Sequence, residues 1–269
     1  MKEASAQISI RGVSKTFSGR GAQEGVTALA DVSLDIYPGE FVVLLGPSGC
    51  GKSTLLNLVA GFARPSSGSI LHEGTEVAGP DRRRTVVFQE YALFPWKTVQ
   101  ENVEFGLKAQ GVSRAERRAT ARHLLSMVHL SGFEDRYPHE ISGGMKQRAA
   151  IARAIAPNPE LLLMDEPFGA LDAQTRVLLQ EEVARISAET RKTIVFVTHS
   201  IDEAVFLGDR IVVMSSRPGR VRETHAVPLA RPRLPSMRSE RTFRELVETL
   251  WASLRPDWQA ETGDLATHV

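Results

Sequence analysis

The residues with the clearest capacity for chemistry form one glycine-rich run, Gly46-Pro47-Ser48-Gly49-Cys50-Gly51-Lys52-Ser53-Thr54. The run matches the pattern G-x-x-x-x-G-K-[ST], in which backbone N–H groups surround a phosphate. The glycines permit that curvature because they carry no Cβ. Lys52 has the length to reach β- and γ-phosphates, and the Ser53 hydroxyl suits Mg²⁺. The run therefore predicts a phosphate-binding loop.

Such a loop needs a strand before it and a helix after it, and both flanks fit. Residues 41–45, Phe-Val-Val-Leu-Leu, are wholly apolar, as expected for a strand buried on both faces. Residues 53–60 read as a helix, and Gly61 is placed to end it. The N-terminus of that helix adds roughly half a positive charge beside the phosphate.

Two carboxylates follow a second apolar strand. Leu161-Leu162-Leu163-Met164 runs directly into Asp165 and Glu166. In sheets of this kind a strand ending in Asp delivers a carboxylate to Mg²⁺, and Glu166 is placed to act as a base toward water. The alternative is a strand that simply ends at a polar loop. A third apolar strand, residues 193–197, leads to His199, which is expected at the same edge of the sheet.

Three further positions are weaker signals when each stands alone. Ser142-Gly143-Gly144 opens a helix and predicts a second anion-binding helix end, although a glycine-rich cap is the equal alternative. Gln89 follows the β-type run of residues 85–88. Phe17, in the stretch after a predicted strand, is either loop or minor core, or an aromatic face that stacks on adenine. With the phosphate loop present, we favour stacking.

The remaining pattern predicts the organisation of the chain. Residues 8–13 alternate like a strand at an exposed sheet edge, and residues 69–77 predict a hairpin around Gly74. Helices are predicted over residues 99–107, 113–130, 141–156, 172–190 and near 243–254, with a strand over 210–214. We expect a main domain of residues 1–228, an inserted helical subdomain of about residues 90–155, and a short helical extension of residues 229–269.

Composition excludes several classes of protein. Of the 269 residues 42% are hydrophobic and 24% charged, which describes an ordinary globular chain. The net charge of +1 gives no argument for a nucleic-acid partner. No apolar run approaches the ~20 residues of a membrane span, and the first seven residues lack a signal core. The single cysteine fits a reducing cytoplasm.

Taken together, these motifs resemble the ATP-binding cassette (ABC) ATPases over about residues 8 to 225. The resemblance implies an α/β fold: a P-loop NTPase core with a mostly parallel sheet flanked by helices, an antiparallel β subdomain and an inserted α-helical subdomain. It implies ATP and Mg²⁺ as cofactors. It implies catalytic roles for Gln89, Glu166 and His199. It also implies that Ser53, Gln89 and Asp165 coordinate Mg²⁺.

The same resemblance assigns nucleotide contacts to Phe17, to the whole run from Gly46 to Thr54, to Ser142-Gly143-Gly144 and to Asp172. One departure is Ile141-Ser142-Gly143-Gly144-Met145, where the family has L-S-G-G-Q. The anion site depends on Ser142 and on backbone, so we expect activity to remain.

The partners implied by the resemblance are a second cassette in a homodimer, transmembrane permease subunits and, indirectly, a periplasmic or surface solute-binding protein, with no nucleic acid. The expected location is the cytoplasmic face of the inner membrane. Permease contact is expected at Tyr91 to Trp96, which is unusually aromatic for a chain with 6% aromatic residues.

Three segments, Phe94-Pro95-Trp96, residues 165–173 and residues 216–220, further resemble importers of nitrate, sulfonate or taurine. The sequence does not identify the solute, because a cassette does not touch it. The alternatives are a P-loop kinase, which has no use for Ser142-Gly143-Gly144, and a non-transport cassette protein, which usually carries two cassettes or long insertions.

Overall fold

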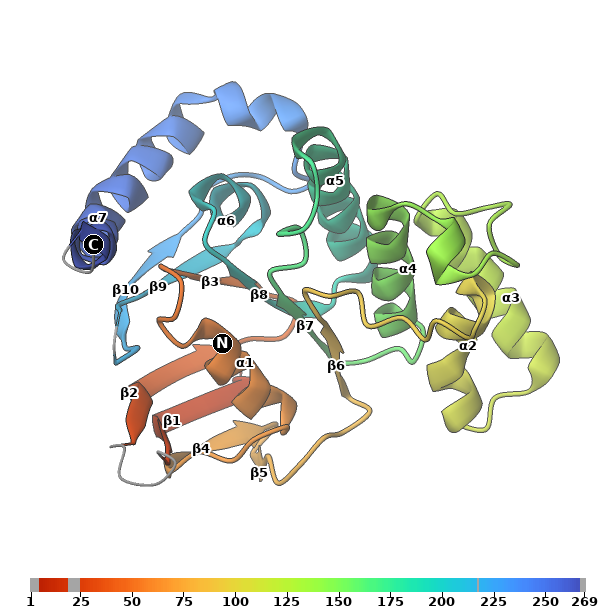
Figure 1. Ribbon diagram of the computed structural model, residues 1–269, viewed down its shortest axis with the longest axis horizontal. Helices are drawn as coiled ribbons and strands as arrows, with labels where there is room; N and C mark the ends of the chain where they lie inside the picture. Colours follow the sequence, from red (N-terminus) through yellow and green to blue (C-terminus); the bar gives the residue numbers. More distant parts are fainter. Residues whose placement is uncertain (1–4, 19–24, 217, 267–269) are drawn as a thin grey trace. The chain divides into compact units, whose positions relative to one another are not determined.

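The computed structural model describes residues 5–18, 25–216 and 218–266, and side chains as far as Pro256. Within this part the chain forms two compact units (Figure 1). The first comprises the described residues up to Pro80 and those from Thr193 onward, and the second comprises residues 81–192. Arg217, part of the segment that resembles importers, lies outside the described residues.

The first unit contains an antiparallel sheet in the strand order β2-β1-β4-β5 (Figure 1). Its strands are β1 (Ile8–Phe17), β2 (Val26–Ile36), β4 (Ser67–His72) and β5 (Thr75–Glu76). The predicted hairpin is confirmed, since Leu71 pairs with Glu76 and His72 with Thr75. The exposed-edge position expected for residues 8–13 is wrong. Strand β1 pairs on both sides and buries Ile8, Ile10 and Val13, because β2 takes the edge.

The first unit also contains strands β10-β9-β3-β8 in that order. β3 (Phe41–Leu45) is parallel to β8 (Thr193–Thr198) and to β9 (Arg210–Met214). β10 (Val221–Ala226) closes this edge antiparallel to β9. Every residue of β3 and β8 is buried, as their apolar sequences predict. Helix α1 (Lys52–Ala60) follows β3, and α6 (Ile201–Leu207) connects β8 to β9.

Arginines bind the C-terminal segment to the end of α6 and to the turn between α6 and β9. Arg231 donates hydrogen bonds to Asp209 Oδ1 and to the carbonyl of Leu207, each at 2.8 Å. The Arg233 side chain is fully buried, donates to the Gly208 carbonyl, and has its pKa lowered to about 10 by burial. The 3₁₀ helix η2 (Pro235–Ser239) and α7 (Arg241–Ala266) follow, and α7 packs on α6 (Figure 1).

The second unit combines a parallel strand pair with four helices. β6 (Arg84–Val87) pairs with β7 (Leu161–Asp165), and Val87 lies opposite Met164. The helices are α2 (Val99–Ala109), α3 (Arg114–Met127), α4 (Gly143–Ile155) and α5 (Ala173–Thr190), with a 3₁₀ turn η1 (Pro138–Glu140) between α3 and α4. Helix α2 packs on both α3 and α4, and α4 packs on α5.

Candidate nucleotide-binding site

The glycine-rich run forms a loop between the last residue of β3, Leu45, and the first residue of α1, Lys52. Gly49 and Gly51 have φ values of 73° and 93°, in the left-handed region that favours glycine. Gly51 is the N-cap of α1, and no side chain caps the helix there. The first turn of α1 holds no acidic residue. Its N–H groups and helix dipole are therefore available to an anion.

Lys52 lies across this loop. Its side chain is buried, and Nζ donates hydrogen bonds to the carbonyls of Gly46 at 2.8 Å and Pro47 at 2.7 Å. Ser48, Gly49 and Ser53 are exposed, whereas Thr54 is half-buried. The loop thus combines a fixed ammonium group with exposed backbone and an exposed hydroxyl, a donor set that fits a phosphate with its Mg²⁺.

The Cys50 thiol differs from the expectation raised by its neighbours. A helix N-terminus and a lysine favour thiolate, and Sγ lies 3.7 Å from Lys52 Nζ. Cys50 is nevertheless fully buried, and burial raises the pKa of the thiol despite the opposing effect of Lys52. Desolvation therefore outweighs the two neighbouring groups that favour thiolate.

Segments distant in the sequence, around Ala28, Met214 and Gly219, pack against the loop. A Cβ on Gly46 would lie 2.7 Å from the Met214 carbonyl oxygen, and one on Gly219 would overlap the Cys50 carbonyl. Gly219 N–H donates to the Ala28 carbonyl at 2.9 Å, and its own carbonyl accepts from Ala30 N–H at 3.0 Å. In the sequence, only the Pro218-Gly219 turn pointed to this support.

The two remaining candidates of the first unit lie at strand ends. Thr198 ends β8 and pairs with Leu45 in the parallel register, so the chain leaves the sheet for His199 at the same edge as for the loop. His199 is exposed. Phe17 ends β1 and is 49% exposed, with Lys15 Nζ 5.2 Å from the ring centroid. A partly exposed aromatic ring of this kind has a face available for a base.

In the second unit, Gln89 and the carboxylates follow neighbouring parallel strands. Gln89 lies two residues after β6, Asp165 ends β7, and Glu166 follows it half-buried. A Cβ on Gly169 would lie 3.3 Å from Gln89 Nε2 and 3.9 Å from Glu166 Oε2, so these two side chains border the same point. Glu166 has φ 41°, a left-handed conformation that costs about 1–3 kcal/mol for a residue with a side chain.

Ser142 and Asp172 each cap a helix of the second unit. Ser142 Oγ accepts a hydrogen bond from Met145 N–H at 3.3 Å at the start of α4. Asp172 accepts from Thr175 N–H at 3.0 Å at the start of α5, and these backbone donors lower its pKa. Gly144 has no room for a side chain, because a Cβ there would overlap Thr175 Cγ2. The glycine therefore allows α4 and α5 to meet closely.

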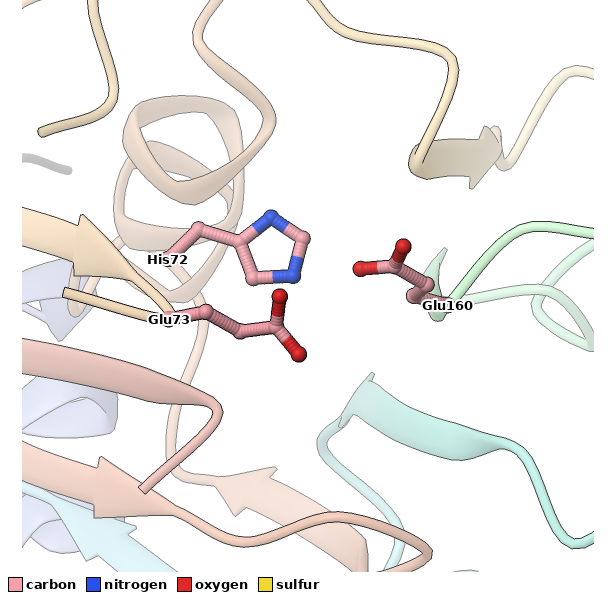
Figure 2. Close-up of side chains that lie close together, drawn as sticks. All are labelled: His72, Glu73 and Glu160. Carbon is pink, nitrogen blue, oxygen red and sulfur yellow. The ribbon is translucent and has the colours of Figure 1, made fainter. Parts of the chain in front are cut away.

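The predicted site residues thus divide between the two units. The first unit holds Phe17, the run from Gly46 to Thr54, and His199. The second holds Gln89, Ser142-Gly143-Gly144, Asp165, Glu166 and Asp172. Figure 2 shows His72 and Glu73, at the end of β4, with Glu160, which precedes β7. Because these three residues belong to different units, we assign no metal site to them.

Comparison with known proteins identifies the class that this loop and fold define. The family model described as "ABC transporter" matches residues 29–169. The chain is 35% identical to a solved dimer of an ATP-binding cassette in a post-hydrolysis state, bound to ADP and phosphate. That likeness has a TM-score of 0.72 and covers 83% of this chain and 100% of the solved chain. The chain belongs to the ABC transporter family, and the predicted P-loop NTPase fold with its antiparallel subdomain is confirmed.

Two relatives have more specific names. The chain is 50% identical over 205 residues to the taurine import ATP-binding protein TauB of Roseobacter denitrificans, covering 76% of each chain. It is 53% identical over 209 residues to the nitrate import ATP-binding protein NrtC of Synechococcus elongatus, covering 77% of this chain and 32% of that relative. None of the described helices has an apolar stretch long enough to cross a membrane.

Proposed function

We propose that this chain is the ATP-hydrolysing subunit of an importer for taurine, nitrate, a sulfonate or a similar small solute. The observation that carries the proposal is the phosphate loop: a buried strand, left-handed glycines, an uncapped helix N-terminus and Lys52 fixed across the loop. The names of the similar TauB and NrtC proteins support the importer group. The chain works beside permease subunits, on the cytoplasmic face of the membrane.

In this proposal each unit contributes part of the chemistry. The N–H groups of the loop and α1 bind the β- and γ-phosphates, Lys52 neutralises their charge, and Phe17 stacks on adenine. Ser53, Gln89 and Asp165 would hold Mg²⁺, which when bound offsets phosphate charge. Their hydroxyl, amide and carboxylate oxygens are the hard donors this ion prefers. Glu166 accepts a proton from the attacking water, and His199 orients the γ-phosphate.

The second half of the nucleotide site comes from another copy of the chain. Ser142-Gly143-Gly144 at the start of α4 presents a helix N-terminus, and Asp172 follows at the start of α5. Two helix N-termini on opposite sides of a triphosphate neutralise it better than one. The solved cassette similar to this chain is a dimer, which supports a homodimer closed by ATP and reopened by hydrolysis.

The domain boundaries belong to the same proposal. Residues 1–228 form the ABC ATPase domain with its helical insertion at about 90–155, and residues 229–269 form a short extension. Tyr91 to Trp96 contacts the permease, and a solute-binding protein outside the membrane delivers the solute to it.

Reconstitution with the cognate permease tests the proposal. We expect detergent-dependent co-purification, ATP hydrolysis, and ATP-dependent uptake of labelled solute that unlabelled taurine or nitrate inhibits. ATP hydrolysis without permease association would contradict the transport function. Phosphorylation of an acceptor molecule in place of phosphate release would favour a kinase.

A further inference from the structure

A closed ring of three hydrogen bonds surrounds the segment that carries His199. The N–H of Ser200 donates to Thr198 Oγ1 at 3.0 Å, and the Thr198 hydroxyl donates to Glu203 Oε2 at 2.5 Å. The backbone N–H of Glu203 then donates to Ser200 Oγ at 3.4 Å, which caps α6. The ring joins residues on both sides of His199, so it fixes the backbone from which the imidazole projects.

Thr198 and Glu203 are buried and Ser200 is half-buried, although His199 is exposed. Thr198 is 2% exposed and Glu203 is 6% exposed. Burying a hydroxyl or a carboxylate costs free energy of folding unless the group has a hydrogen-bond partner. An apolar side chain would fill either position without that cost, so packing alone does not explain Thr198 and Glu203. The exposed imidazole of His199 is thus attached to a backbone segment that buried hydrogen bonds hold in place. Such an arrangement keeps a functional side chain in one position.

The position of the ring relates it to the phosphate loop of the same unit. Thr198 pairs with Leu45, the last residue of β3 before the loop, in a parallel register. In parallel sheets, ligands bind where the strands end at the carboxyl edge. The ring therefore anchors His199 at the level at which the phosphate loop begins.

We propose that Thr198 and Glu203 are positioning residues for ATP hydrolysis, which act through the backbone of His199. The inference rests on the proposed function. Loss of the ring lets the imidazole move away from the γ-phosphate, while the groups that bind the nucleotide stay in place. Turnover therefore falls, whereas the KM for ATP does not.

Two substitutions at Thr198 and one at Thr193 form the test. Thr198→Val keeps the shape and removes the hydroxyl, and Thr198→Ser keeps the hydroxyl. Thr193→Val is the matched control, because Thr193 is also 2% exposed and lies at the other end of β8. Its hydroxyl donates a hydrogen bond to Gln7 Oε1 and accepts one from Gly39 N–H at 2.9 Å.

We expect Thr198→Val to lower kcat about ten- to hundred-fold, the cost of a small misplacement, with KM for ATP within about twofold of wild type. Thr198→Ser should restore kcat to within a few-fold. Thr193→Val should lower the melting temperature as much as Thr198→Val does, without the loss of kcat. Equal kcat losses in the two valine variants would overturn the inference, because the effect would then be one of stability.

A second pair keeps the test decisive if Thr198→Val does not fold. Glu203→Gln retains an oxygen that accepts from Thr198, and Glu203→Met does not, so only the methionine variant should lose turnover. A double variant with His199→Ala, measured by single-turnover hydrolysis of labelled ATP, tests the route. If Thr198→Val still lowers the rate in that background, Thr198 does not act through His199.

The outcomes separate this inference from the proposed function. A wild-type chain that does not hydrolyse ATP with its permease contradicts the proposed function. A wild-type rate that falls in His199→Ala but stays unchanged in Thr198→Val overturns the positioning role alone.

Discussion

At the scale of single residues, Glu166 is the proposed base. Its backbone is held in a left-handed conformation, and its carboxylate borders the same point as Gln89. Glu166→Gln keeps the shape and removes the proton acceptor, so we expect ATP binding to remain and turnover to fall ~10²-fold or more. Nucleotide titration and phosphate release measure the two effects.

Glu189→Gln on α5, which breaks only a surface ion pair with Arg185, is the control. Turnover of Glu166→Gln within a few-fold of wild type would show that another group activates water.

Cys50 leads to a prediction about pH. Because burial raises the pKa of this thiol, the folded chain binds its proton more tightly than the unfolded chain does. The contribution of the thiol to stability is therefore complete below the ordinary thiol pKa and is lost as pH rises above it. Denaturant unfolding of wild type and Cys50→Ala, from below to above the ordinary thiol pKa, measures this contribution to the free energy of unfolding. The difference between the two free energies should fall as pH rises above that pKa, and it should not change with pH below neutrality.

Alkylation gives a second measurement on the same thiol. Iodoacetamide should react with the native chain far more slowly than with the unfolded chain, because Cys50 is buried and protonated. Rapid stoichiometric labelling of the native chain would contradict the burial of Cys50.

At the scale of elements, the segment from Tyr91 to Trp96 has three different aromatic environments. Trp96 is 69% exposed, and its ring centroid lies 5.7 Å from that of Phe94. The Phe94 centroid in turn lies 4.6 Å from that of Phe105 and 5.6 Å from Arg153 Cζ. The Tyr91 hydroxyl lies 3.0 Å from where a Cβ on Gly143 would be. The three positions therefore differ in what they stabilise, and a core position for Phe94 rather than for Tyr91 or Trp96 agrees with the alternative that the sequence left open.

From these environments we expect Trp96→Ala to leave the melting temperature nearly unchanged and to weaken permease association by ~2 kcal/mol or more, as an interface anchor does. Phe94→Ala is the matched comparison and should destabilise the chain itself, because it removes the ring between Phe105 and Arg153. A thermal melt beside a pull-down with the permease measures both. A large stability loss in Trp96→Ala, with the pull-down intact, would contradict the docking surface.

Some elements were predictable from local pattern and others were not. The strand at residues 41–45 and the helix ended by Gly61 each carry their signal within a few residues, as do the caps Ser142 and Asp172. The seven-residue helix α6 is too short for a clear period, and β10 reads Val-Arg-Glu-Thr-His-Ala, too polar for a strand signal. The position of β1 inside its sheet depends on pairing with β2 and β4, which local pattern does not contain.

At the scale of the whole molecule, the proposed dimer predicts complementation. Lys52→Ala should lose ATP binding, and Ser142→Arg should bind ATP as a monomer without hydrolysing it. A mixture of the two variants forms heterodimers in which one composite site has both a native loop and a native Ser142, so part of the activity should return. Hydrolysis at varied mixing ratios measures this. Loss of ATP binding by Ser142→Arg alone would contradict its action across the dimer.

The site as a whole was predictable only where residue types carry chemistry. The loop, the carboxylates and His199 can be recognised because their spacing serves a reaction. Thr198 and Glu203 could not be recognised, because they contribute a hydrogen bond between two residue types that are common at the end of a strand and the start of a helix. Gly219 could not be recognised either, because it contributes only its small volume beside Cys50, which is distant in the sequence.

Gly219 shows how the loop can be tuned from outside. Its backbone lies so close to the Cys50 carbonyl that one added methyl group has to displace the loop. Gly219→Ala should therefore raise the KM for ATP, although no group that would bind the nucleotide is altered. Gly79→Ala, where a Cβ meets nothing within 4 Å, is the control. Nucleotide affinity is therefore expected to depend on a residue outside the binding motif. Natural variation or engineering at position 219 would alter this affinity while the sequence of the motif stays unchanged.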